Sequence, residues 1–203
     1  MHRIAIEPSA ARGGVRRYVV AVVDSLGAVL LSALLTGFVG GIALRAAMRA
    51  VALVYPELLR GFTWGGTAFV VASGVLFGLA NGLPYALARP ALPSNPLRSG
   101  ALYGAGALAV FGVPFFLSNP DGDLFGPQAP LSVALFGAIF VLGGLLMACA
   151  ASGALRYLER RPRGRAWARG IGILLLVPAG ATLTGVGYEM IFETIPAIRL
   201  NWG

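Results

Sequence analysis

GFVGGIALRAAMRAVALVYPELLRGFTWGGT, residues 37–67 of the chain, ends one apolar segment, carries two arginines and begins the next apolar segment. The 20 residues before Arg45, residues 25–44, contain no charge, which is about the length that a helix needs to cross a bilayer. Arg45 therefore falls at a membrane boundary. Pro56 lacks a backbone N–H and disfavours further helix, and apolar residues resume after Gly66. The stretch predicts two successive transmembrane helices.

Two arginines of this stretch are four residues apart. On a continuing helix Arg45 and Arg49 project from one face. Residues 45–60 then form an interfacial helix or extend the first span. Either the two arginines reach the lipid head groups from an interfacial connector, or they form an ion-paired or ligand-binding couple.

The composition is that of a membrane protein. Of the 203 residues 57% are hydrophobic and 12% are charged, whereas about 25% of a soluble domain is charged. The net charge of +8 does not indicate a nucleic-acid partner, because the arginines are distributed over several connecting segments. Every cation is arginine, and together with the alanine and glycine content this is typical of a GC-rich bacterial genome. We expect a multi-pass protein of the bacterial plasma membrane, in contact with the lipid bilayer.

Apolar segments alternate with connections rich in arginine, proline or glycine, which predicts an all-α polytopic integral membrane protein. Residues 1–17 form a basic cytoplasmic tail, and residues 18–203 form one transmembrane helical domain. A span beginning at Tyr18 would bury Asp24, and the cost of an unpaired carboxylate in the membrane favours a later start that leaves Asp24 at the cytoplasmic edge. The five expected spans are residues 25–44, 66–88, 100–117, 131–155 and 170–188.

The distribution of arginines predicts the orientation. With the N-terminus inside, 12 arginines lie on the cytoplasmic side and 4 lie outside. This bias predicts an N-inside, C-outside protein. Six of the inside arginines fall between Arg156 and Arg169, where we expect anionic lipids as partners.

Catalytic and metal chemistry find little support in the sequence. His2 is the only histidine and Cys149 the only cysteine, which excludes Ser–His and Cys–His pairs and His-based metal sites from the membrane region. Asp121 and Asp123 lie in a turn-rich loop with too few oxygen ligands for calcium. We expect no cofactor, no metal and no catalytic residue.

One helix face is expected to pack against another helix. Gly74, Gly78 and Gly82 recur every four residues, which leaves a smooth stripe that lets two backbones approach closely. Asn81 lies beside this stripe and either hydrogen-bonds across helices or contacts a ligand.

A second charged pair lies near the end of the chain. Glu189 and Glu193 are four residues apart and follow the fifth span. At 1.5 Å per residue they reach about the same height as Arg45 and Arg49. We predict a two-rung ladder of opposite charges that joins the first span to the fifth.

The letters LRAAMRAVAL and GFTWGGT are similar to segments of a family of short polytopic membrane proteins of bacteria without a characterised activity. This resemblance implies no function and no site residue. Three hypotheses follow from the residues. The first is a non-enzymatic accessory, assembly or structural subunit, with a homo-oligomer or another membrane protein as partner. The second is a small transporter or channel that uses Arg45, Arg49, Glu189 and Glu193 for an anionic or proton-coupled substrate, and the third is a lipid-handling enzyme.

Overall fold

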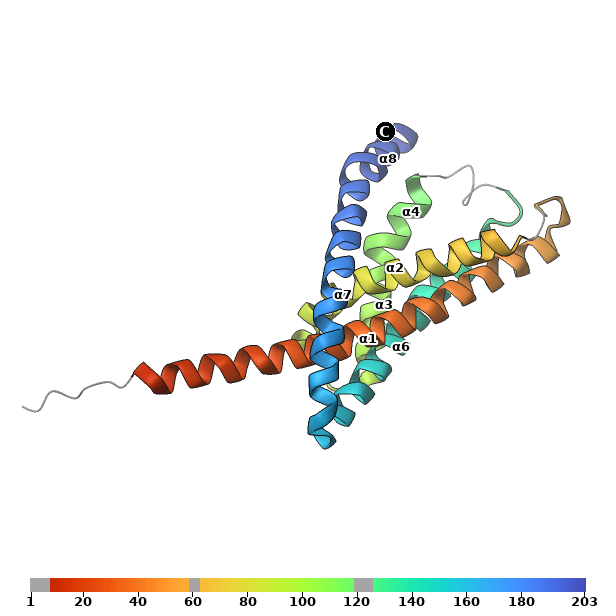
Figure 1. Cartoon of the computed structure of the whole chain (residues 1–203). Helices are drawn as coiled ribbons and strands as arrows, with labels where there is room; N and C mark the ends of the chain where they lie inside the picture. Colours follow the sequence, from red (N-terminus) through yellow and green to blue (C-terminus); the bar gives the residue numbers. More distant parts are fainter. Residues whose placement is uncertain (1–7, 59–62, 119–125) are drawn as a thin grey trace, which may run out of the picture.

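The computed structural model describes residues 8–58, 63–118 and 126–203, apart from the side chains of residues 8–21, 24, 162 and 163. Its regular elements are helical (Figure 1). The long helices and their continuations are α1 Pro8–Val54, α2 Trp64–Ala88, α3 Pro96–Ala107, α4 Val113–Ser118, α6 Ala129–Arg160, α7 Pro162–Glu189 and α8 Ile195–Trp202. Two one-turn 3-10 helices, η1 Pro56–Leu58 and η2 Arg89–Ala91, follow α1 and α2.

Five helical stretches are each long and apolar enough to cross a membrane within the described ranges. The prediction of an all-α protein with about five transmembrane helices is thereby confirmed. In the structure these stretches are Ser25–Val54, Trp64–Ala91, Pro96–Ser118, Ala129–Arg160 and Gly164–Trp202. The chain is a multi-pass membrane protein.

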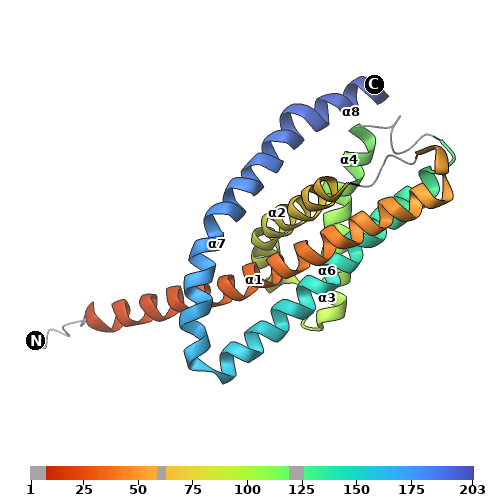
Figure 2. The same ribbon diagram turned by 45° about the vertical axis from the view of Figure 1, so that its right-hand side comes forward.

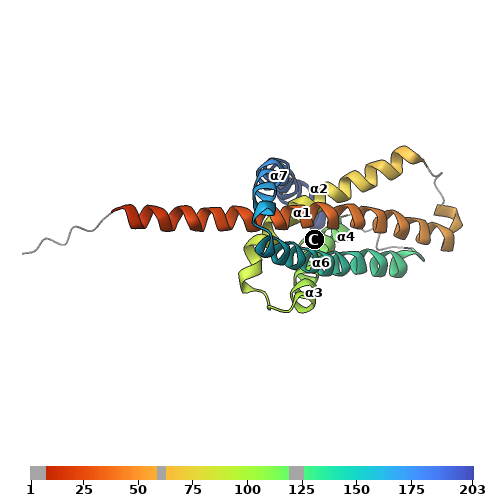
Figure 3. The same ribbon diagram turned by 60° about the horizontal axis from the view of Figure 1, so that its bottom comes forward.

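Helix α1 runs without a break for 47 residues and includes residues 8–17. In Figures 1 and 3 its N-terminal part extends beyond the other helices. At the other end residues 45–54 extend the first helix, which ends two residues before Pro56. Residues 1–7 and the side chain of Asp24 lie outside the described part.

Helix α1 also forms the centre of the packing. It contacts α2, α6 and α7, whereas α3 packs against α6. Two buried clusters fill these contacts. The first joins residues of α1, α2 and α6, namely Val29, Ala33, Tyr85, Met147, Ala148 and Ala151, and the second joins residues of α1, α2 and α7, namely Leu30, Leu79 and Ala179.

Glycines set the distance between α1 and α2. A Cβ added at Gly78 would lie 2.5 Å from the Cα of Gly37, and one added at Gly74 would lie 2.6 Å from the Cα of Gly41. No side chain fits such a contact, so the two backbones touch where both helices carry glycine. Gly82 also faces α1, where a Cβ would lie 2.8 Å from the Cβ of Ala33.

Glycines also allow close backbone contact where α3 meets α6. A Cβ at Gly100 would lie 2.6 Å from the Cα of Leu145, and one at Gly104 would lie 2.7 Å from the carbonyl oxygen of Phe140. Between α1 and α7, a Cβ at Gly172 would lie 2.6 Å from the Cα of Gly27. Close backbone crossings thus join three pairs of helices, α1 with α2, α3 with α6 and α1 with α7.

Two spans are each interrupted by a π-helical turn. The turns are η3 Leu108–Gly112 and η4 Met190–Thr194. Val113 donates its N–H to the carbonyl of Leu108, and Ile195 donates to Met190, five residues back in each case. Proline follows immediately, at Pro114 and Pro196. A proline ring crowds the carbonyl four residues back, and a wider turn is one way in which a helix accommodates it.

Candidate functional site

A buried polar contact lies between α2 and α3. The hydroxyl of Tyr103 donates to the carbonyl oxygen of Asn81 at 2.7 Å and lies 3.4 Å from its side-chain oxygen. Nδ2 of Asn81 donates in turn to the carbonyl of Phe77 at 2.9 Å. The ring of Tyr85, itself 1% exposed, stands edge-on to Tyr103 at 5.0 Å between centroids. Asn81 therefore takes part in a hydrogen bond between helices.

A second buried polar side chain is Thr36 on α1, which is 7% exposed. Its hydroxyl oxygen has no hydrogen-bond partner among the described residues. Ser32, one turn earlier, instead donates to the carbonyl of Ala28 at 2.8 Å. An unpaired buried hydroxyl costs free energy, so Thr36 is a candidate contact for a ligand or a water molecule.

Arg45 bridges the first two helices. Its Nε donates to the hydroxyl of Thr67 on α2 at 3.2 Å, and that hydroxyl donates to the carbonyl of Thr63 at 3.1 Å. Arg45 is half-buried, whereas Arg49 is exposed. Close by along the chain, the hydroxyl of Tyr55 donates to the carbonyl of Pro127 at 2.7 Å and ties the end of α1 to the start of α6.

The two glutamates lie on a different part of the molecule. Glu189 ends α7 and Glu193 belongs to η4; both are exposed, and η4 contacts α4 and α8. Beyond their crossing at Gly27 and Gly172, α1 and α7 diverge in Figures 1 and 2. The predicted ladder stays a prediction.

The last helix closes onto the third span. Nδ2 of Asn201 donates to the carbonyl of Ser118, and Nε1 of Trp202 donates to that of Leu117, each at 3.0 Å. These bonds satisfy two carbonyls in the last turn of α4, where a helix leaves its carbonyls without intrahelical donors. As Figure 2 shows, α8 and α4 lie side by side at the far end of α7.

The arginines between α6 and α7 make local contacts. Nε of Arg156 donates to the carbonyl of Ser152 at 3.2 Å, and Nε of Arg165 donates to that of Leu158 at 3.1 Å. The guanidinium carbon of Arg161 lies 5.6 Å from the centroid of the Tyr157 ring, which is a cation–π contact. This turn is a compact, exposed basic surface.

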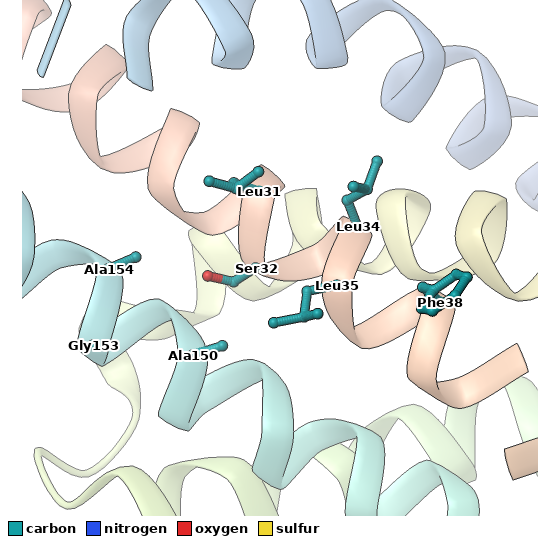
Figure 4. A pocket seen from close by; sticks show the side chains of 8 residues that line it. All are labelled: Leu31, Ser32, Leu34, Leu35, Phe38, Ala150, Gly153 and Ala154. Carbon is teal, nitrogen blue, oxygen red and sulfur yellow. The ribbon is translucent and has the colours of Figure 1, made fainter. Parts of the chain in front are cut away.

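A groove of about 610 Å³ lies between α1 and α6 (Figure 4). Large side chains of α1 form one wall, and small residues of α6 form the other. The lining residues are Leu31, Ser32, Leu34, Leu35 and Phe38 of α1 with Ala150, Gly153 and Ala154 of α6. A smaller apolar hollow of about 380 Å³ lies along α7 between Ala166 and Leu174. Neither contains Arg45, Asn81 or a glutamate.

Metal-binding side chains do not cluster within the described ranges, where no three of the histidine, cysteine, aspartate and glutamate residues converge. Cys149 is exposed. Asp121 and Asp123 lie outside the described residues. Comparison with known proteins finds no matching family model, no matching curated protein and no matching solved structure.

Three features of the structure were not predicted from the sequence. Tyr103 was missed because a lone tyrosine in an apolar segment carries no pattern. The π turns were missed because proline alone does not say how the preceding turn adapts. The α1 side of the glycine crossing did leave a signal, since Gly37 and Gly41 have the same spacing of four as Gly74 and Gly78.

Proposed function

We propose that the chain is a non-enzymatic subunit of the bacterial plasma membrane that assists the assembly or architecture of other membrane components. The observation that carries this proposal is that polar side chains join neighbouring helices. Tyr103 of α3 donates to the carbonyl of Asn81 on α2, and Arg45 of α1 donates to the hydroxyl of Thr67 on α2. Both hollows described above are apolar and face outward. Polar groups are thus used for joining helices, as expected of a structural module.

The proposal includes the N-inside, C-outside orientation, which rests on the arginine count. Twelve arginines on one side against four on the other favour a cytoplasmic N-terminus. The use of arginine alone as cation supports a bacterial source.

A small transporter or channel is the second candidate. One observation favours it, namely the buried hydroxyl of Thr36 that lacks a partner in the described part. Two π turns add to it, because such turns occur at functional sites in helices. A lipid-handling enzyme is favoured by no specific contact, since Glu57, Glu189 and Glu193 are exposed residues on separate elements.

Water access to the interior decides between the two candidates. Single cysteines are placed at Thr36→Cys and Asn81→Cys in a Cys149→Ala background and treated with a membrane-impermeant maleimide. Ser94→Cys, in the exposed connection after η2, is the reactive control. We expect neither interior cysteine to react from either side, because a dry interior holds no thiolate and admits no reagent. Reaction of either one at a rate comparable with Ser94→Cys would favour transport and overturn the first proposal.

The same reagents test the orientation. We expect Ser94→Cys to react only when the cytoplasmic side is accessible, as in inverted vesicles. Gly203→Cys, at the exposed C-terminus, should react in intact spheroplasts. The reverse pattern would contradict the orientation without affecting the assembly proposal.

A further inference from the structure

We propose that the groove between α1 and α6 binds one anionic phospholipid, with an acyl chain in the groove and the phosphate at the basic end of α6. This site goes beyond the proposed function, because it is a specific lipid site rather than general contact with the bilayer. The argument rests on the groove's lining, its position within two spans and the charges that follow it along α6.

The lining of the groove matches a hydrocarbon chain. Seven of its eight residues are apolar, and the one hydroxyl, that of Ser32, is already bonded to the carbonyl of Ala28. Figure 4 shows Leu31, Leu35 and Phe38 on one side and Ala150 and Ala154 on the other. All eight lie within the apolar stretches Ser25–Val54 and Ala129–Arg160. Its volume of about 610 Å³ is within the usual range for small-molecule sites.

The helical repeat continues the groove wall into the basic turn. Tyr157 follows Gly153 by four residues and Ala154 by three, so it lies on the same face of α6. Arg160 follows Gly153 by seven residues, which is two turns further along that face. At 1.5 Å per residue Arg160 lies about 9 Å beyond Ala154. This offset suits a phosphate that sits at the membrane surface while its acyl chain enters the groove.

The end of this face carries the charge that a phosphate requires. Arg160 and Arg161 are exposed, and the guanidinium of Arg161 is placed over the ring of Tyr157. Guanidinium groups bind phosphate oxygens through two N–H donors at once, and the Tyr157 hydroxyl adds a donor on the same face. One acid, Glu159, lies among them, so the turn remains positive. Charge complementarity therefore selects an anionic over a zwitterionic lipid.

A substitution at Gly153 can test the groove without disturbing the bundle. A Cβ at Gly153 would meet no atom within 4 Å, so Gly153→Leu fills the groove while leaving the helix contacts intact. Gly143 is a matched control, because it is on the same helix, also meets nothing within 4 Å and does not line the groove.

The test is native mass spectrometry of the full chain in detergent, titrated with dioleoyl phosphatidylglycerol. We expect one tightly retained lipid, weaker retention of dioleoyl phosphatidylcholine, and no displacement by glycerol phosphate. Gly153→Leu should weaken retention about tenfold by excluding the acyl chain, and Gly143→Leu should not. Arg160→Gln and Arg161→Gln should each weaken it about fivefold, while Arg199→Gln, at the far end of the fifth span, should not.

Several results would overturn the site. Unchanged retention in Gly153→Leu would show that the groove holds no acyl chain. Equal losses of lipid retention in Arg160→Gln and Arg199→Gln would show that retention depends only on the net charge of the protein. Displacement by glycerol phosphate alone would indicate a free-phosphate site. Loss of a dimer rather than of lipid in Gly153→Leu would place a second copy of the chain in the groove. None of these outcomes depends on the proposed assembly role.

Discussion

Helices α2 and α7 are both rich in glycine, yet their glycines lie in opposite surroundings. Gly74 and Gly78 of α2 touch the backbone of α1, whereas a Cβ at Gly180, Gly185 or Gly187 of α7 would meet nothing within 4 Å. A spacing of four keeps the α2 glycines on one face, while spacings of five and two turn the α7 glycines to different faces. The spacing of glycines, rather than their number, indicates where helices cross.

The comparison extends to the helices that α2 and α7 meet. At the α1–α2 crossing both partners present glycines four residues apart, Gly37 and Gly41 against Gly74 and Gly78. At the α1–α7 crossing Gly27 of α1 faces Ala168 and Gly172 of α7. Further along, α7 packs against α1 and α2 through Ala179, and η4 and α8 contact α4 (Figure 2). The first hairpin thus has two pairs of facing glycines, whereas α7 has one.

The largest expected effect comes from breaking the α1–α2 crossing. Gly78→Leu should lower the free energy of unfolding by about 1–3 kcal/mol or more, because its Cβ would lie within 2.5 Å of the Cα of Gly37. Gly185→Leu on α7 should change it by less than about 0.5 kcal/mol. SDS-induced unfolding in mixed micelles measures both. Equal effects of the two substitutions would remove the distinction between the helices.

A smaller effect is expected from the polar contact that joins α2 to α3. Tyr103→Phe removes the hydroxyl that donates to Asn81 and should cost about 1 kcal/mol. The ring contact with Tyr85 remains. Tyr188→Phe on α7 is the control, since Tyr188 is 59% exposed. If the two variants unfold alike in the same assay, the Tyr103–Asn81 bond contributes nothing to stability.

The sequence was sufficient for the number and type of spans. Uncharged runs of about 20 residues have few alternative structures in a bilayer, where every backbone group needs an internal partner. The ends of the helices were less predictable. Residues 45–60 were expected to form an interfacial helix or to extend the first span, and α1 continues to Val54.

Which helices contact each other could largely not be predicted from the sequence. A stripe such as Gly74 and Gly78 indicates that another helix packs against α2, but it does not identify that helix, because α1, α6 and α7 all carry small residues. The ladder of charges stays a prediction for the same reason. Residue counts give equal heights along two helices, whereas the distance between those heights depends on the crossing angle, which no local pattern encodes.

The smallest expected effect concerns the end of the α1–α2 crossing, where Arg45 donates to Thr67 at 3.2 Å. A double-mutant cycle on Arg45→Ala and Thr67→Ala should give a coupling energy of about 0.6 kcal/mol, the size typical of one hydrogen bond between membrane helices. The matched cycle pairs Arg45→Ala with Glu189→Ala on α7. Additivity there within about 0.5 kcal/mol would exclude the predicted ladder, whereas a coupling above that value would require α7 to approach α1 at Arg45. The two cycles share one variant, so any disturbance that Arg45→Ala causes by itself cancels from their difference. A coupling to Thr67 that is absent for Glu189 would thus show that α1 is joined through polar side chains to α2 and not to α7.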